Sequence, residues 1–324
     1  MRALQVTRLS EDLGGVELRD IPQPAPGPGK VLIAVRAASV NYPDLLMARG
    51  EYQMKPDLPF TLGGDLAGEV VAVGEGVTRV APGDLVTAIG IGAFCDCALM
   101  PEATVDPWPE QLAAPQAAAF GAAYLTAYVA LVERGRMQPG DWVLVHGASG
   151  GMGLAAVDLA KALGARVIAT STSDEKLDEI RRLYAPDQVI NIRSGFRDKV
   201  LEITGGKGAD VIFDPVNGDV FDESVRCVAF DGRLLVVGFT GNRITSIKTN
   251  LTLIKAFSVV GVRAGEYFRR FLDRRPRATS ALQELVRDGR ICPHVCREFP
   301  IEDWKSAFGL VAGRQALGKV VLTL

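Results

Sequence analysis

The sequence predicts an α/β protein that combines a β-rich part with a doubly wound parallel sheet. Two observations lead to this prediction. The first 120 residues hold short apolar runs separated by turns rich in Gly and Pro, a pattern typical of a β barrel or sandwich. Between residues 142 and 239, short apolar runs alternate with segments of helical spacing. This alternation predicts a parallel sheet with helices on both faces.

The β-rich part contains three clear strand candidates, at residues 31–35, 66–73 and 85–89. Turns are predicted at residues 22–29, 73–76 and 82–84, because Pro fixes φ and Gly permits positive φ.

In the middle of the chain, five strands are predicted, at residues 142–147, 165–171, 188–191, 210–214 and 232–239. The helices between them are expected near residues 152–164, 174–183, 196–204 and 221–230. After residue 255 the alternation fades, and the tail is expected to hold a strand at 257–265, a helix at 280–288, a strand at 295–299, a helix at 301–312 and a strand at 319–324. Such a tail can pack back on the β-rich part.

Composition limits the possible partners. The 324 residues are 48% apolar and 23% charged, which is enough apolar material for about two domains. The net charge of −2, without a charge run, argues against nucleic acid and anionic lipid as partners. The N-terminus lacks the features of a signal peptide, and no run of about 18 apolar residues is found. A soluble cytoplasmic protein without a membrane partner is therefore expected.

Five cysteines are spread along the chain, at positions 95, 97, 227, 292 and 296. An odd number in a chain of this length argues against a disulfide framework. Cys95 and Cys97 form a CxC pair, which is either a metal or redox pair or two strand residues on one face. We favour the strand interpretation.

The strongest local signal is a Gly-rich turn between a predicted strand and a predicted helix, GASGGMG at residues 147–153. Gly150 and Gly153 occupy the second and third positions of a GxGxxG motif, and Ala148 replaces the first Gly. Small residues let the backbone N–H groups at a helix N-terminus approach a pyrophosphate. A Gly-rich turn can also be purely structural, but the flanking strand and helix favour a dinucleotide site. The expected contacts in the loop are Ser149, Gly150, Gly151, Met152 and Gly153.

The segment after the second strand of this sheet favours NADPH. A site for NAD usually carries Asp or Glu there, about 20 residues after the loop, to bind the ribose 2′-OH. Ser171 occupies this position, and hydroxyl groups do not repel a 2′-phosphate. Lys176 and Arg193 are candidates to neutralise the phosphate, unless they are ordinary surface charges. The further expected contacts of the cofactor in this segment are Thr170, Thr172 and Ser173.

With the cofactor loop in place, the chain resembles the medium-chain dehydrogenase/reductase superfamily, and within it the zinc-free quinone oxidoreductase (zeta-crystallin-like) branch. The resemblance covers essentially the whole chain. It rests on the residues SVNYPD at 39–44, LGGDLAG at 62–68, GDWVL at 140–144 and ASGGMG at 148–153, followed by Lys161. Asp158 is a departure, since the branch usually has Gln there.

The resemblance implies a Rossmann domain inserted into a GroES-like catalytic domain. The expected boundaries are 1–121 and 263–324 for the catalytic domain and 122–262 for the Rossmann NADP-binding domain. The resemblance also implies a homodimer, with the strand near residues 257–262 close to the subunit contact.

Zinc must be considered, because the superfamily includes zinc alcohol dehydrogenases. At the positions that match two of their zinc ligands, this chain has Asn41 and Gly64 in place of Cys and His. The four-Cys structural zinc loop is absent, and the only histidines are His146 and His294. Because zinc needs several N or S ligands in one place, no metal site is expected.

The resemblance places Asn41, Tyr52 and Thr126 around the catalytic cleft. Asn41 could donate an amide N–H to the oxygen that gains charge, and Tyr52 could donate a hydrogen bond or a proton. The alternatives are a buried amide that satisfies a loop, a core aromatic ring and a helix hydroxyl. Asp44 is expected to orient the loop. The segments expected beside the nicotinamide contain Gly238, Phe239, Val262 and Arg263, the last of which could instead be a cation of the dimer surface.

These observations together predict an NADPH-dependent, zinc-independent reductase that transfers hydride to a quinone or another conjugated carbonyl compound, with a small molecule as its partner. An alternative on the same scaffold is the reduction of an enoyl or acrylyl thioester or of an enal. An alternative from another class is a non-enzymatic NADPH-binding protein.

Overall fold

The structure is a computed structural model that describes residues 1–241 and 243–324. The chain forms two compact units, Met1–Ala122 with Cys292–Leu324, and Ala123–Ile291. The first boundary lies next to the expected one, but the second lies well after residue 262. The reason is that helices α8 (Ala264–Arg270) and α9 (Arg274–Arg287) belong to the second unit. Tyr267 Oη and Arg274 Nη1 both donate to Glu133 Oε2 within that unit, at 2.9 Å each.

The first unit is β-rich, as predicted, and its strands form two sheets. The smaller sheet has the order β2 (Val16–Asp20), β1 (Arg2–Val6), β4 (Phe60–Thr61). The larger sheet has the order β15 (Val295–Pro300), β16 (Lys319–Thr323), β3 (Lys30–Val40), β5 (Asp65–Val73), β6 (Leu85–Ile89), β8 (Val105–Pro107), and β7 (Cys97–Pro101) also pairs with β3. Its helices include α1 (Tyr42–Arg49) and α10 (Trp304–Ala312).

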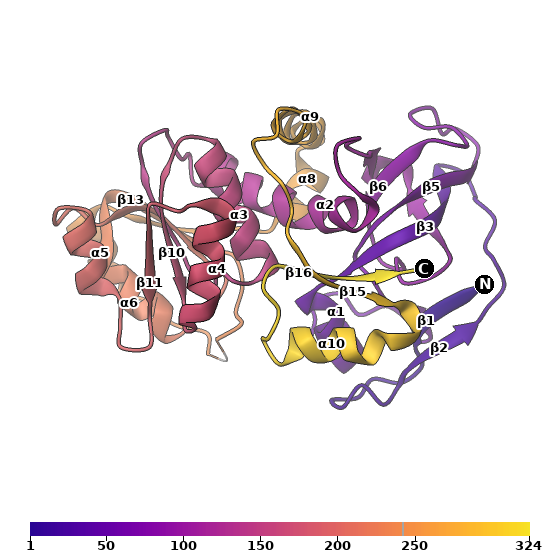
Figure 1. Cartoon of the computed structure of the whole chain (residues 1–324), viewed down its shortest axis with the longest axis horizontal. Coiled ribbons are helices and arrows are strands. Elements are labelled where there is room, and N and C mark those ends of the chain that lie inside the picture. The colour runs from indigo at the N-terminus through magenta and orange to yellow at the C-terminus, as the bar shows by residue number, and fades with distance from the viewer. Residues whose placement is uncertain (242) are drawn as a thin grey trace. The chain divides into compact units, whose positions relative to one another are not determined.

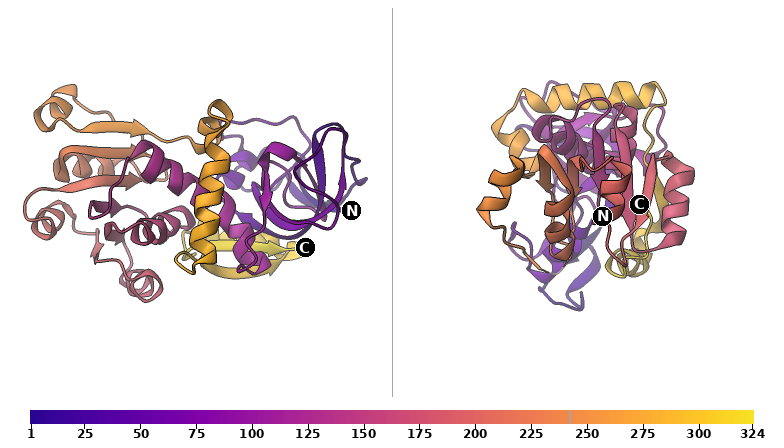
Figure 2. Two further views of the ribbon diagram at one scale, coloured as in Figure 1. Left: turned by 90° about the horizontal axis from the view of Figure 1, so that it is seen from above. Right: turned by 90° about the vertical axis from the view of Figure 1, so that its left-hand side faces the viewer.

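The C-terminal tail completes the larger sheet of the first unit (Figure 1 and Figure 2). Strand β16 lies antiparallel to β3, with Val320 opposite Val40. On the other side of β3, Ser39 lies opposite Asp65 of β5. This register brings the start of β16, at Lys319, to the end of β3, where α1 begins.

The second unit contains the predicted doubly wound parallel sheet. All neighbouring strands are parallel, and their order is β11 (Gln188–Asn191), β10 (Arg166–Ser171), β9 (Trp142–Val145), β12 (Ala209–Asp214), β13 (Val228–Val236), β14 (Ser258–Gly261). Helices α3 (Gly151–Ala162) and α4 (Asp174–Tyr184) lie on one face of the sheet, and α5 (Arg197–Ile203) and α6 (Asp219–Cys227) on the other (Figure 1). Helix α7 (Thr249–Lys255) precedes β14.

The predicted helix at 221–230 was wrong at its C-terminal end. Helix α6 ends at Cys227, and β13 begins at Val228, which lies opposite Ala209 of β12 and is 1% exposed. Burial of a β-branched residue and a partner strand outweigh the helical spacing of the sequence. The strand predicted at 257–265 is likewise shorter, because β14 ends at Gly261 and α8 follows.

Helix α2 (Ala114–Tyr128) continues directly into a π-helical segment, Val129–Arg134. Together they are long and apolar enough to cross a membrane by length and composition, and 67% of the most apolar window is buried inside the protein. Burial of this kind is typical of a core helix, whose apolar surface packs against other parts of the same chain.

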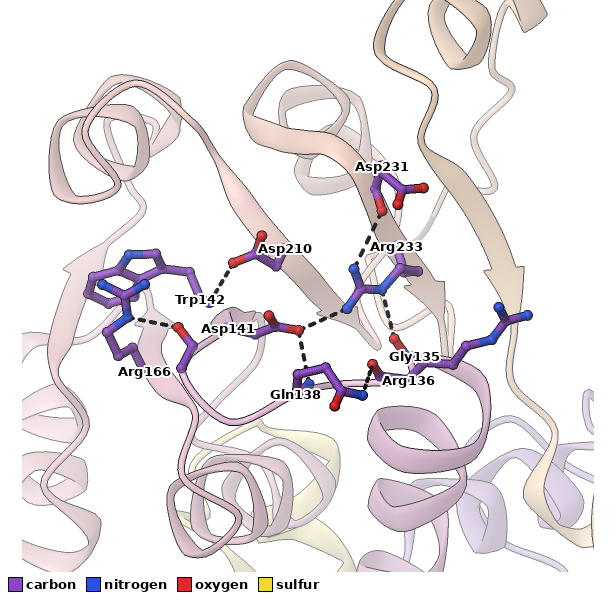
Figure 3. A network of polar contacts seen from close by, with 10 residues as sticks. Gly135, Arg136, Gln138, Asp141, Trp142, Arg166, Asp210, Asp231 and Arg233 are labelled. Atoms are coloured by element: carbon purple, nitrogen blue, oxygen red, sulfur yellow. Dashed lines mark hydrogen bonds and ion pairs between the residues drawn. The ribbon is translucent and has the colours of Figure 1, made fainter.

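A polar network ties together the edge of the sheet where β9 begins (Figure 3). Arg233 Nη2 donates to Asp141 Oδ2 at 2.9 Å, and Arg233 Nε donates to the carbonyl oxygen of Gly135 at 2.7 Å. The Asp210 carboxylate accepts from the backbone N–H of Trp142 at 2.8 Å. Since these bonds join the amino ends of β9 and β12 and Arg233 within β13, they fix the edge of the sheet opposite the carboxyl-end loops.

Candidate functional site: a nucleotide loop and a buried charge cluster

The Gly-rich loop lies at the carboxyl end of β9, where α3 begins. Strands β10 and β12 flank β9 on its two sides, so the chain leaves this strand at the point where ligands bind in open α/β sheets. Gly147 has a φ of +57°, a left-handed conformation that favours Gly. The backbone N–H of Gly150 donates to the carbonyl oxygen of Gly147 at 2.9 Å, which closes the turn.

Gly153 is the position of closest approach in this loop. A Cβ atom added there would lie 2.2 Å from the carbonyl oxygen of Gly147, so only Gly fits. A Cβ at Gly150 would lie 3.4 Å from the same oxygen, which is an ordinary contact. The N-terminus of α3 can thus lie directly against the turn, and its first backbone N–H groups, at Gly151, Met152 and Gly153, are the donors suited to an anion.

The residues after β10 divide into interior and surface positions. Thr170 is buried, and its hydroxyl donates to the carbonyl oxygen of Val145 at 3.2 Å and lies 3.0 Å from Nδ1 of His146. The Thr170 side chain therefore contacts the residues just before the Gly-rich loop from the protein interior. Ser171 is 7% exposed, and its Oγ accepts from the backbone N–H of Ser173 at 3.3 Å. Thr172 is exposed at this end of the strand.

Ser173 is the N-cap of α4, and its Oγ accepts from the backbone N–H of Lys176 at 3.3 Å. The acidic first turn of α4 suits the helix dipole, as predicted. Arg193 follows β11 and is exposed. It helps to lower the pKa of Glu175, after the larger effect of the hydrogen bond from Ser173. Arg193 is thus close enough to the first turn of α4 to interact with its charges.

Two further predicted segments lie at the same edge of the sheet. Gly238 and Phe239 follow β13, and the Phe239 side chain is 50% exposed. The backbone N–H of Val262 donates to the carbonyl oxygen of Val236 at 2.9 Å, so Val262 continues the pairing of β14 with β13. Arg263 is exposed at the start of α8. The carboxyl ends of β9, β10, β11, β13 and β14 therefore carry all the predicted cofactor contacts.

In the first unit, Asn41 belongs to a buried cluster of charged and polar side chains. Its Nδ2 donates to the Ser39 carbonyl oxygen and to Asp65 Oδ2, both at 3.1 Å. Its Oδ1 accepts from Lys319 Nζ at 2.5 Å. Both amide hydrogens are directed into the protein, so the amide N–H that the sequence suggested for a substrate oxygen is engaged elsewhere.

Asp65 and Lys319 form an ion pair inside this cluster. Their side chains are 1% and 7% exposed, and Lys319 Nζ lies 3.5 Å from Asp65 Oδ2. The same carboxylate accepts from Ser39 Oγ at 2.9 Å and from the backbone N–H of Ala122 at 3.2 Å. The Asp65 carboxylate is therefore surrounded by one cation and three N–H or O–H donors, from Ser39, Asn41 and Ala122.

Asp44 lies beside this cluster, in the first turn of α1. Its Oδ2 accepts from the backbone N–H of Asn41 at 2.7 Å, so it connects the loop before α1 to the first turn of the helix, in line with the expected orienting role. Its other oxygen, Oδ1, is buried without a hydrogen-bond partner in the described part of the chain. Burial raises the pKa of Asp44 to about 7, against the opposing effect of the Asn41 hydrogen bond.

The other two catalytic candidates, Tyr52 and Thr126, are both partly buried. Tyr52 follows α1 and packs partly buried against the core of the first unit. Thr126 lies in α2 and is half-buried. Tyr52 belongs to the first unit and Thr126 to the second.

His146 and Cys95 have interior surroundings, whereas Cys97 is partly exposed at the start of β7, and Cys95 lies outside that strand, in an isolated bridge with Ala3. His146 is fully buried between Thr170 Oγ1 and Ser224 Oγ, at 3.0 and 2.9 Å, and burial lowers its pKa to about 3. This arrangement makes it a neutral structural residue. Cys95 is buried, and its Sγ donates to the Gly92 carbonyl oxygen at 3.1 Å.

Sequence reasoning missed two members of the charge cluster, Asp65 and Lys319. Asp65 stood within a motif that we used only for the family resemblance. Lys319 is 278 positions from Asn41 along the chain, and no local pattern points to it. The sequence predicted a strand at 319–324, but only its pairing with β3 brings the Lys319 side chain to Asn41.

Comparisons with known proteins fit this arrangement. Family profiles match two parts of the chain: residues 27–129 match "Alcohol dehydrogenase GroES-like domain" and residues 151–280 match "Zinc-binding dehydrogenase". Mouse quinone oxidoreductase-like protein 2 is 37% identical over 327 residues, covering 100% of this chain and 92% of the relative. Human quinone oxidoreductase is 34% identical over 332 residues, covering 100% of this chain and 98% of the relative. The chain belongs to the medium-chain dehydrogenase/reductase superfamily, as a quinone oxidoreductase-like member.

Solved structures agree with this family. A mycobacterial protein complexed with NADPH matches with a TM-score of 0.92 and 28% identity, over 100% of both chains. The JamJ enoyl reductase in its apo form matches with a TM-score of 0.89 and 27% identity, over 100% of this chain and 99% of that one. The chain is thus an oxidoreductase of this superfamily, with a GroES-like and a Rossmann part.

The close approach at Gly153 yields a testable prediction. The substitution Gly153→Ala should destabilise the protein by about 1–3 kcal/mol, because the new methyl group overlaps the carbonyl oxygen of Gly147. It should also weaken nucleotide binding, since α3 must move away from the turn. Urea unfolding and nucleotide fluorescence titrations measure the two effects. The matched variant Gly150→Ala should unfold at the wild-type urea concentration, and equal stability of the two variants would contradict the prediction.

Proposed function

We propose that this protein is an NADPH-dependent, zinc-independent oxidoreductase that transfers hydride to a quinone or another conjugated carbonyl compound. The observation that carries the proposal is the strand–turn–helix at β9, in which Gly153 packs on the Gly147 carbonyl, combined with a β10 that ends in Ser171 and not in an acid. Membership of the quinone oxidoreductase-like group supports the acceptor class. We further propose a cytoplasmic location, which cell fractionation would test.

In this proposal, the second unit binds the nucleotide. The N-terminal N–H groups of α3 donate to the pyrophosphate. Ser171 and the backbone around Thr172 and Ser173 receive the ribose 2′-phosphate, and Lys176 and Arg193 supply positive charge. Support for NADPH also comes from the structural neighbour that was solved in complex with it.

The nicotinamide is proposed to lie along the loops after β13 and β14, at Gly238, Phe239, Val262 and Arg263. The half-exposed Phe239 ring offers an apolar surface for one face of the nicotinamide and excludes water from it. Bound NADPH supplies the hydride. In the first unit, we propose Asn41 and Tyr52 as contacts of the acceptor; in the second unit, we propose Thr126 of α2 as a contact of either ligand. A hydride and one proton convert a quinone to a hydroquinone, and solvent can supply the proton.

The residues of the first unit do not fit the zinc that the name of one matching family implies. Zinc in proteins is held by three or four Cys, His, Asp or Glu ligands, and no group of three such residues that could hold a metal occurs among residues 1–241 and 243–324. At the family's ligand positions stand Asn41 and Gly64, and the Lys319 ammonium lies 3.5 Å from Asp65. A cation in this place repels a second one. We therefore derive no step through zinc.

A second candidate function on the same scaffold is the reduction of an enoyl thioester or an enal. The similarity to an enoyl reductase, at 27% identity over nearly all of both chains, favours reduction of an enoyl thioester or enal. Both acceptor classes share a polarised double bond that accepts hydride, so the same residues serve either reaction. A non-enzymatic NADPH-binding protein is the remaining alternative, and it would bind nucleotide without turnover.

An acceptor screen tests the function directly. With NADPH, we expect the highest kcat/KM for a benzoquinone or naphthoquinone, a lower value for simple enones and the lowest for acrylyl-CoA. The same rates are expected after treatment with EDTA, and the purified protein should contain no stoichiometric zinc by atomic absorption. Preference for the thioester would establish the enoyl reductase alternative. Binding of NADPH without turnover of any acceptor would defeat the proposed reaction, and loss of activity with EDTA that zinc restores would defeat the metal-free proposal.

The choice of nucleotide makes a separate prediction. NADPH should be used several-fold better than NADH, because Ser171 leaves the 2′-phosphate unopposed. The substitution Ser171→Asp should lower kcat/KM for NADPH by about ten-fold or more, since it places a carboxylate against the phosphate, and should affect NADH much less. Ser171→Ala, which changes the side chain without adding charge, serves as the matched control. Equal use of both nucleotides by the wild type would contradict the prediction.

We also propose that the protein is a homodimer that pairs at the edge of the second unit's sheet. Strand β14 ends the sheet in the part of the chain that the structure describes, and Val259 on it is 39% exposed. Leu253 and Ile254 of the preceding helix are 81% and 68% exposed. An apolar edge strand of this kind is a template for a second copy. Sedimentation velocity should give a dimer for the wild type and a monomer for Val259→Lys, and a monomeric wild type at micromolar concentration would refute the proposal.

A further inference from the structure

Lys319 is a buried lysine whose side chain has only oxygen partners from the cluster around Asn41. The side chain is 7% exposed, and its Nζ lies 2.5 Å from Asn41 Oδ1 and 3.5 Å from Asp65 Oδ2. Removing an ammonium group from water is costly unless paired charges and hydrogen bonds compensate for it. Packing alone does not explain why strand β16 begins with a buried lysine.

The Lys319 ammonium selects one orientation of the Asn41 amide. Because a lysine only donates hydrogen bonds, the amide must turn its oxygen toward Nζ. Its two hydrogens then face the Ser39 carbonyl oxygen and the Asp65 carboxylate. The opposite orientation would direct an NH2 group at the ammonium and a carbonyl oxygen at a carboxylate. Asp65 and the Ser39 carbonyl oxygen, which only accept, favour the same orientation, and Lys319 is the one donor that holds the amide oxygen in the part of the chain that the structure describes.

The charge of Lys319 also matters for an acceptor at Asn41. Asp65 is a buried carboxylate whose Oδ2 lies 3.1 Å from Asn41 Nδ2. Without a cation beside it, this carboxylate would oppose any negative charge that develops on an oxygen near Asn41, since buried charges interact strongly. The ammonium cancels this effect.

We propose that Lys319 is a positioning residue of the acceptor site: it holds the Asn41 amide in one orientation and neutralises Asp65. This inference rests on the proposed function, in which Asn41 lies at the acceptor. In this role, the ammonium provides the positive charge beside Asp65 from within the chain.

The first experiment distinguishes two roles of Lys319: orienting the Asn41 amide, and only neutralising the charge of Asp65. Lys319→Met should lower kcat for a benzoquinone by about ten-fold or more, with an unchanged Kd for NADPH, whose proposed contacts lie in the other unit. The double variant Asp65→Asn with Lys319→Met removes both charges, so it should regain the wild-type unfolding midpoint while kcat stays low. Lys319→Arg, which keeps the charge and the donor, should recover part of kcat. Lys305→Met, which removes an exposed lysine of the same unit, is the control and should behave as the wild type.

The second experiment needs no turnover. In protein labelled with 15N-asparagine, the Asn41 side-chain amide signal, identified by its loss in Asn41→Ser, should show slow hydrogen exchange in the wild type and faster exchange in the double variant. Slow exchange together with a wild-type kcat in the double variant would overturn the inference, because Lys319 would then only balance Asp65. If the wild type turns over no acceptor, the proposed function fails, and the exchange rates alone decide the inference: equal protection in both proteins overturns it.

Discussion

The contact between the start of α3 and the turn after β9 is the constraint on which the nucleotide-binding unit depends. Because a Cβ at Gly153 would lie 2.2 Å from the Gly147 carbonyl oxygen, the helix can approach the strand this closely only with Gly at that position. The approach places the positive end of α3 at the carboxyl edge of the sheet. Thr170 and His146 support the turn from the interior. The network around Arg233 fixes the opposite edge (Figure 3), so the loops that carry the predicted contacts extend from a rigid sheet.

The β-rich unit depends on a different principle, the pairing of strands from distant parts of the chain. Strand β3 lies between β5 and β16. The cluster around Asn41 contains Ser39 from the end of β3, Asp65 from the start of β5 and Lys319 from the start of β16. The cluster contains an ammonium, two carboxyl groups and an amide, nearly all of it buried. Such a set is stable only when the register is correct, because a shift of one residue would turn Lys319 to the other face of the sheet. The polar cluster therefore also specifies the pairing of the C-terminal strand.

The family relationship limits the chemistry without deciding the acceptor. The same scaffold is present in proteins named quinone oxidoreductase and enoyl reductase, which is expected when a fold supplies the nucleotide site and variable residues supply the acceptor site. In this chain, the first unit contains a buried ion pair between Lys319 and Asp65, whereas a zinc site needs several Cys, His, Asp or Glu ligands in one place. The proposed hydride transfer to an acceptor that is already polarised needs no metal ion.

The sequence by itself determined the features that depend on local chemistry. The strand–turn–helix at residues 142–164, the Ser171 position and the alternation of strands and helices all follow from residue types at short spacing, and the structure has the corresponding sheet and helices. Only the tertiary structure decided the features that depend on long-range pairing. The start of β13 at Val228 required a partner strand, and the second unit extends to Ile291 because α8 and α9 belong to it. The orientation of the Asn41 amide required Lys319, 278 positions away. Hydrogen-bond directions inside a buried cluster depend on every neighbour at once, and the order of residues along the chain does not contain that information locally.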